Sequence, residues 1–237
     1  MKKAPLVLLP GLEGQIDFLI KNLDLTNKKV LVIGAGSDYI ASKISRLSSQ
    51  HVDIIVDDAD SMLLTRLNLS GHKNISCSMM DFDSTNFEDN SFDVVFAQAS
   101  ISSPNRKKIL KEIFRILKPE SYLCSGELIK LKNEIPPFIK NILSVSNLSP
   151  LNISDLKKLY EDLNYFFIAE VDLSHTLNLY FDKAKQTAEI AEKSFKENEK
   201  AFHKKLLNRF AHESNSFLKF GADKYLGFYS FIFKTRS

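Results

Sequence analysis

The stretch that decides the fold is LVIGAGSDYIASKI (31–44). An apolar run leads into two glycines one residue apart, Gly34 and Gly36, and then into apolar residues at helical spacing. Glycine suits a position where the backbone turns sharply and a ligand approaches without a Cβ in the way. This strand, turn and helix start therefore predict a loop that holds a nucleotide-like ligand, although the same pattern also occurs as a plain βα turn.

Strand and helix patterns alternate on both sides of that turn. The predicted strands are 29–34, 52–58, 75–80, 91–98, 121–128, 165–173 and 225–235. The predicted helices are 38–49, 59–69, 104–117, 149–164 and a long charged one with an apolar stripe over 184–210. Ser154 is the expected N-cap of the fourth. Such alternation is typical of βαβ units, so we expect an α/β fold with a Rossmann-like, mostly parallel sheet covered on both faces.

Composition places the chain among ordinary globular proteins. Of its 237 residues 44% are apolar and 26% charged, and the net charge of +3 is too mild to argue for nucleic acid. Cys77 and Cys124 are the only cysteines and are far apart, which predicts no metal site and fits a reducing compartment. The apolar start contains Pro5 and Pro10 and is interpreted as an ordered segment. No apolar run reaches membrane-spanning length, so a cytoplasmic protein is expected.

The residues around the glycine turn discriminate between ligands. A dinucleotide fingerprint needs a small residue where this chain has Tyr39, which argues against NAD and FAD. No GxxxxGK[ST] phosphate loop occurs, and Asp38 would repel a pyrophosphate. A cationic ligand with a ribose and a base fits better.

Acidic residues after the second and third strands suit that ligand. Asp57 and Asp58 end the second strand, where one carboxylate can bind ribose hydroxyls while the other caps the next helix. Asp81 and Phe82 follow the third strand and suit an adenine amino group and an adenine face. Which of the two adjacent aspartates binds the ribose stays open at this point.

These segments resemble the class I S-adenosylmethionine-dependent methyltransferases, from about Lys28 to Leu128. The matching pieces are VLVIGAG (30–36), IIVDDADSML (54–63), MDFDSTNFEDNSFDVVFAQAS (80–100) and ILKEIFRILKPESYL (109–123). The resemblance implies a seven-stranded sheet with an antiparallel last strand, and S-adenosyl-L-methionine as the cofactor. It also implies the cofactor-binding residues: Gly34, Ala35 and Gly36 at the methionine part, Asp57 or Asp58 at the ribose, Asp81 and Phe82 at the adenine, and Gln98 with the residues to Ile101 facing the sulfonium.

Two departures from the family pattern touch the cofactor. Val32 stands where an acidic residue is usual, and Asp38 stands where the third glycine is usual. One hypothesis is that Asp38 restores the missing negative charge near the cofactor. The alternative is a degenerate site.

The acceptor must be inferred from parts outside the common sheet. Methyl transfer requires alignment and exclusion of water more than a nucleophile–base pair. Ala97-Gln98-Ala99-Ser100 replaces the NPPY-type loop, which disfavours a flipped base. We expect a small-molecule acceptor, with His175 and Tyr225 as candidate catalytic or pocket residues. The alternatives are a repurposed, non-catalytic fold and a protein or RNA methyltransferase.

The expected organisation is one methyltransferase-like domain over 1–237. Its parts are an N-terminal segment (1–27), a cofactor-binding core (28–173), a helical lid insert (174–224) and a final strand (225–237).

Overall fold

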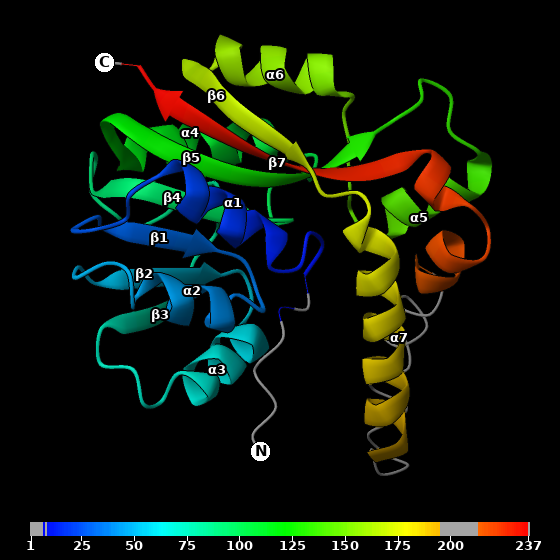
Figure 1. Cartoon of the computed structure of the whole chain (residues 1–237), viewed down its shortest axis with the longest axis horizontal. Coiled ribbons are helices and arrows are strands. Elements are labelled where there is room, and N and C mark those ends of the chain that lie inside the picture. The colour runs from blue at the N-terminus through cyan, green and yellow to red at the C-terminus, as the bar shows by residue number, and fades with distance from the viewer. Residues whose placement is uncertain (1–6, 8, 195–212, 237) are drawn as a thin grey trace.

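The computed structural model describes residues 7, 9–194 and 213–236. Its centre is a seven-stranded sheet with the strand order β3-β2-β1-β4-β5-β7-β6 (Figure 1). The strands are β1 (Val30–Ile33), β2 (Val52–Val56), β3 (Ile75–Met79), β4 (Phe92–Gln98), β5 (Leu117–Lys130), β6 (Tyr165–Asp172) and β7 (Leu226–Thr235). The first five pair in parallel, and β7 runs antiparallel to both β5 and β6. The predicted α/β sheet with an antiparallel last strand is confirmed.

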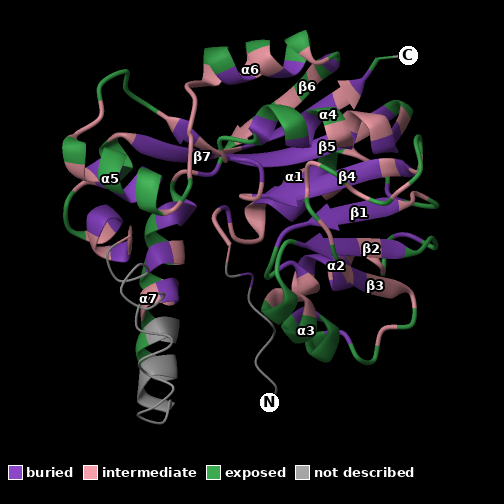
Figure 2. Cartoon of the chain, turned by 180° about the vertical axis from the view of Figure 1, so that it is seen from behind, coloured by how far each residue is buried: buried purple, intermediate pink, exposed green. Residues whose placement is uncertain are grey.

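Helices cover both faces of the sheet because its central strands are apolar on both sides. In β1, Val30 and Val32 belong to the core with helices α1 and α2, whereas Leu31 and Ile33 belong to the core with α4 and α6. The first layer holds α1 (Gly14–Asn22), α2 (Asp38–Ile44) and α3 (Ala59–Asn68), and the second holds α4 (Arg106–Ile116) and α6 (Ile153–Asp162). Figure 2 shows the central strands buried between these layers.

A third apolar cluster lies beside the carboxyl ends of the parallel strands. It joins α5 (Pro137–Val145) and α7 (Thr176–Ser194) to the helical residues 213–218, the short helix η1 (Ala222–Lys224) and the start of β7. Figure 1 shows α7 leaving the sheet beyond β6. The expected helical stretch of 184–210 is seen as far as residue 194; its members Phe195, Phe202, Leu206 and Phe210 lie outside the described residues.

Two local expectations were wrong, and one helix was not predicted. The helix that was not predicted is α5, which begins at Pro137 because proline needs no hydrogen-bond donor at the first helical position. The cap of α6 is Asn152, whose side chain accepts from the Asp155 backbone, and not Ser154. Strand β5 begins at Leu117, immediately after α4, and not at residue 121 as expected. The proline-containing segment before residue 121 is therefore the irregular start of the strand.

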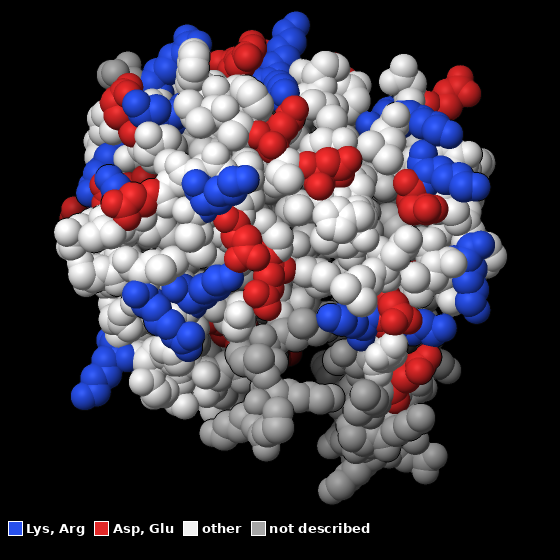
Figure 3. All heavy atoms as spheres, in the orientation of Figure 1, with Lys and Arg blue, Asp and Glu red and all other residues white. Residues whose placement is uncertain are grey.

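Charges are mixed on the face of the molecule that Figure 3 shows. On the face in Figure 3, lysines and arginines lie among aspartates and glutamates rather than in one large patch. No helix in the described part of the chain is long and apolar enough to cross a membrane.

Candidate active site

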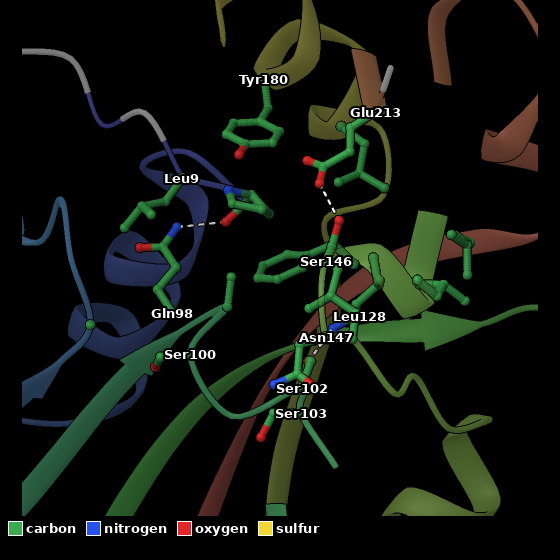
Figure 4. A pocket seen from close by; sticks show the side chains of 18 of the residues that line it. Leu9, Gln98, Ser100, Ser102, Ser103, Leu128, Ser146, Asn147, Tyr180 and Glu213 are labelled. Carbon is green, nitrogen blue, oxygen red and sulfur yellow. Dashed lines mark hydrogen bonds between the residues drawn. The ribbon is translucent and has the colours of Figure 1, made fainter. Parts of the chain in front are cut away.

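A cavity of about 500 Å³ opens at the carboxyl ends of β1, β2 and β4. Open α/β sheets bind their ligands at this edge, where the strand order reverses on either side of β1. The lining residues come from the sheet edge, the N-terminal segment and the third cluster (Figure 4). Gly34, Ala35, Asp57, Phe82 and Gln98, all predicted from the sequence, line the same cavity.

The glycine turn is held open by its neighbours. Gly34 has φ +116°, and a Cβ there would lie 3.0 Å from the Ser100 Cβ. The Ser37 hydroxyl donates to the Gly34 carbonyl at 2.7 Å, and the Ser100 hydroxyl donates to the Ile33 carbonyl at 3.0 Å. Any side chain at position 34 would therefore strain the backbone and fill the edge of the cavity.

The two adjacent aspartates have different surroundings. Asp58 is the N-cap of α3, and its Oδ1 accepts from the Ser61 backbone N–H at 2.8 Å. These hydrogen bonds from Ser61 hold the Asp58 pKa below its usual value. Asp57 lines the cavity. The structure thus gives the capping role to Asp58 and leaves Asp57 for a ligand.

The remaining sequence-predicted cofactor residues are not among those that line the cavity. The Asp38 carboxylate accepts from the Asn68 amide on α3 at 3.1 Å, and Asp38 is not among the lining residues. Asp81 is exposed and forms a backbone bridge with Ser84. Gly36 has φ +74°, and a Cβ there would face the Leu9 side chain at 3.7 Å. Gly36 therefore contributes to the shape of the turn.

Gln98 at the end of β4 is fixed by the N-terminal segment. Its Nε2 donates to the Pro10 carbonyl at 2.7 Å and to the Leu12 carbonyl at 2.9 Å. Carbonyls only accept hydrogen bonds, so these contacts determine which end of the amide is the nitrogen. The Gln98 Oε1 is buried and has no hydrogen-bond partner among the described residues. Figure 4 shows the Gln98 amide below the Leu9 side chain, with a dashed line for the hydrogen bond from its nitrogen.

The N-terminal segment forms a wall of the cavity, which the sequence did not reveal. Leu9 and Pro10 line it, and the Gly11 N–H donates to the Thr176 hydroxyl at the start of α7 at 3.1 Å. Gly11 has φ +86°, and a Cβ there would lie 2.6 Å from the Phe228 ring. The Pro10-Gly11 pair indicates a turn, but the pair does not indicate which part of the fold that turn packs against.

His175 and Tyr225 are not at the cavity. His175 is exposed, and the Tyr225 ring lies 4.9 Å from Lys132 Nζ and packs in the third cluster. Tyr180 and Phe181 of α7 line the cavity instead. The sequence analysis missed Tyr180 and Phe181 because the predicted apolar stripe began only at residue 184, whereas α7 begins at Thr176.

The part of the cavity between the strands β5 and β7 and the helices α5 and α7 is strongly apolar, and we call it the apolar chamber. It is lined by Leu128, Ile142, Leu143, Leu148, Leu177, Tyr180, Phe181, Phe217, Leu226 and Phe228. Glu213 lies at its rim and accepts from the Ser146 hydroxyl. Figure 4 shows Tyr180 and Glu213 across the cavity from Ser102 and Ser103.

A buried ionic network supports the wall behind Ser102. Glu127 is fully buried in β5 and accepts from the Ser102 hydroxyl at 2.5 Å, from Arg106 Nη2 at 3.2 Å and from the Tyr160 hydroxyl at 2.8 Å. Ser102 in turn accepts from the Leu128 N–H at 2.9 Å. Burial and the neighbouring Glu127 charge raise the Tyr160 pKa well above its usual value. The network therefore ties the loop after β4 to β5, α4 and α6.

Comparison with known proteins agrees with this geometry. Residues 31–125, which hold the glycine turn, Asp57 and Gln98, match the model of a methyltransferase domain family. This part of the chain is therefore similar to methyltransferase domains, and one of the similar structures was solved with S-adenosyl-L-methionine. Among the described residues no cluster of metal-ligating side chains is present.

The proteins to which the chain is similar are distant from it in sequence. The ubiquinone/menaquinone biosynthesis C-methyltransferase UbiE of Rickettsia prowazekii is 27% identical over 128 residues, 50% of this chain and 52% of that protein. The chain thus matches about half the length of that curated relative. Phosphoethanolamine N-methyltransferase 2 of Haemonchus contortus, in complex with S-adenosyl-L-methionine, superimposes with a TM-score of 0.75 at 17% identity over 95% of this chain and 53% of that one. The [4+2]-cyclase SpnF gives 0.75 at 15% identity over 94% and 80%. Likenesses this remote show the fold alone.

Proposed function

We propose that the chain transfers a methyl group from S-adenosylmethionine to a small-molecule acceptor bound in the apolar chamber. The observation that carries the proposal is the continuity of one cavity. Gly34, Asp57 and Phe82 line its sheet side, and the aromatic residues of α7 line its far side. A cavity of about 500 Å³ is in the range of small-molecule sites.

The residues at the sheet edge fit the cofactor. The Gly34 turn leaves a space that a Cβ would occupy, which suits close approach of the methionine part. Asp57 would accept hydrogen bonds from the ribose hydroxyls, because Asp58 is engaged as a cap. Phe82, which is partly buried at the edge of the cavity, would contact the adenine. We leave Asp38 out of this set because its carboxylate meets Asn68 on α3.

When bound, S-adenosylmethionine supplies a methyl group already activated by a positively charged sulfonium. The chain itself has to position the methyl donor and the acceptor and to exclude water from them. Leu9 and Pro10 cover the sheet side of the cavity, and α5 and α7 wall the other side. The relatives named as C- and N-methyltransferases are consistent with small acceptors. The helical insert of 174–224, as far as it is described, would act as the lid that shapes this pocket.

The two adjacent aspartates, Asp57 and Asp58, allow a matched test of the cofactor site. Asp57→Ala should weaken binding of S-adenosylmethionine and S-adenosylhomocysteine by about 10- to 100-fold in isothermal titration calorimetry, since a hydrogen bond to a charged group contributes about 1.5–3 kcal/mol. Asp58→Ala is the matched control. It should lower the free energy of unfolding by about 1 kcal/mol through loss of the cap and leave the affinity within about twofold. Equal affinities for Asp57→Ala and the wild type would refute the assigned role, and absence of binding to the wild type would refute the proposed function.

A further inference from the structure

The loop between β3 and β4 brings Phe82 to the cavity, and an ionic cluster on α4 holds this loop from the side. We propose that Glu112 is a positioning residue for the adenine end of the cofactor, because it fixes the turn that presents Phe82. This inference rests on the proposed function, in which Phe82 contacts the adenine. Glu112 is not among the residues that line the cavity, so it acts through the loop.

The loop of residues 80–91 runs from one end of the sheet to the other. It leaves the carboxyl end of β3 and enters the amino end of β4, and both strands have the direction of β1. Near its start, Phe82 lines the cavity and also packs against the core under α4. At its end, the Ser91 N–H donates to the Ile116 carbonyl at 2.8 Å. Contacts of the middle of the loop therefore decide how its first part is held.

Thr85 attaches the middle of the loop to α4. Its backbone N–H and its hydroxyl both donate to Glu112 Oε1, at 2.7 and 2.6 Å. Arg115 holds the same carboxylate, donating from Nε to Oε2 at 2.9 Å and from Nη2 to Oε1 at 2.6 Å. Arg115 Nη1 also donates to Asp89, farther along the loop, at 2.6 Å. Hydrogen bonds to ionised groups are about twice as strong as neutral ones, so this cluster holds Thr85 firmly.

The turn between Phe82 and Thr85 is short and internally bonded. The Ser84 N–H donates to the Asp81 carbonyl at 3.2 Å, and these two residues form a backbone bridge. A shift of the Thr85 backbone therefore moves Phe82 as well. A gap of about 0.5–1 Å already removes a quarter to a half of a dispersion contact. Loss of the Glu112 attachment should thus weaken the contact between the Phe82 ring and the adenine.

Two ligands that differ in the base test this proposal. S-adenosylhomocysteine carries the adenine, and S-ribosylhomocysteine has a hydroxyl in its place. Their affinities for the full chain are measured by isothermal titration calorimetry. Glu112→Ala should weaken S-adenosylhomocysteine by about fivefold or more, because stacking of a base on an aromatic ring contributes about 5- to 150-fold in affinity. The same variant should weaken S-ribosylhomocysteine by less than about twofold.

Asp93→Ala is the matched control. Asp93 is also a partly buried acid that accepts from a backbone N–H, that of Lys29 at 2.9 Å, and from a cation, Lys118 Nζ at 3.0 Å. It lies near the amino end of β4 and is not among the cavity residues, so both affinities should stay within about twofold. Thr85→Val removes one of the two donors to Glu112 at nearly constant volume. It should weaken S-adenosylhomocysteine alone by about two- to threefold, even if Glu112→Ala does not fold.

Phe82→Ala decides whether Glu112 acts through this ring. In that variant, adding Glu112→Ala should change the affinity for S-adenosylhomocysteine by less than about twofold, since the contact it positions is already gone. Effects of the two substitutions that simply multiply would overturn the inference. It would also be overturned if Glu112→Ala and Thr85→Val weakened both ligands equally or neither of them. A wild-type chain that binds no S-adenosylhomocysteine would instead refute the proposed function.

Discussion

The buried pair of Glu127 and Arg106 gives the most quantitative prediction. Glu127→Gln keeps the shape of the side chain and removes its charge, which leaves Arg106, only 4% exposed, without a counter-charge. Breaking a buried ion pair in this way costs about 3–5 kcal/mol. For a chain of 237 residues, each kcal/mol lowers Tm by about 2–4 °C, so the variant should melt about 6–20 °C below the wild type.

The assay is thermal unfolding followed by circular dichroism, with urea unfolding as a second readout. Glu170→Gln is the control, because Glu170 forms an ion pair with Lys157 at 3.0 Å at the surface and should cost no more than about 1 kcal/mol. Adding Arg106→Met to Glu127→Gln should recover at least half of the loss, since the unpaired charge is then gone. A decrease in Tm no larger than that of the surface control would refute the reasoning.

Two further predictions concern titratable groups elsewhere in the fold. Burial raises the Cys124 pKa to about 12 and raises the Cys77 pKa above its usual value, so iodoacetamide at pH 8 should label neither thiol in the native protein and both after unfolding; rapid native labelling would contradict this. Hydrogen bonds from Arg115 and Thr85 lower the Glu112 pKa from its usual 4.5 to about 2, although burial of the carboxyl acts in the opposite direction. The stabilisation by Glu112 is therefore present above about pH 4.5 and is lost as pH falls toward 2, and Glu112→Gln should flatten the acid limb of stability against pH; an unchanged acid limb would be inconsistent with that ion pair.

The fold was predictable because its information is local and periodic. Apolar runs such as 30–33 and 92–98 are bounded by turn residues, and the helices between them carry one apolar face. The start of β5 was mispredicted and α5 was not predicted, because a proline in a sequence can have more than one structural meaning. Pro137 can end a pattern or open a helix, and tertiary packing of Ile139 and Leu143 decides which.

The site was predictable where it depends on strand ends alone. Gly34 and Asp57 follow neighbouring parallel strands, so they were expected at one edge. The choice between Asp57 and Asp58 required the observed cap on Ser61. The chamber residues, by contrast, come from β5, α5, the loop after α5, α7, residues 213–218 and β7. The Gln98 amide is held by carbonyls more than 80 positions earlier in the chain. No local pattern encodes contacts of that kind.

The central claim is that the cavity between the glycine turn and α7 holds the cofactor. The most direct measurement is a crystal structure of the protein with S-adenosylhomocysteine. The account predicts density for the ligand against Gly34 and Phe82, with its ribose hydroxyls within hydrogen-bond distance of the Asp57 carboxylate. Density at another surface, or a ribose bound by Asp58 with the cap on Ser61 broken, would contradict it.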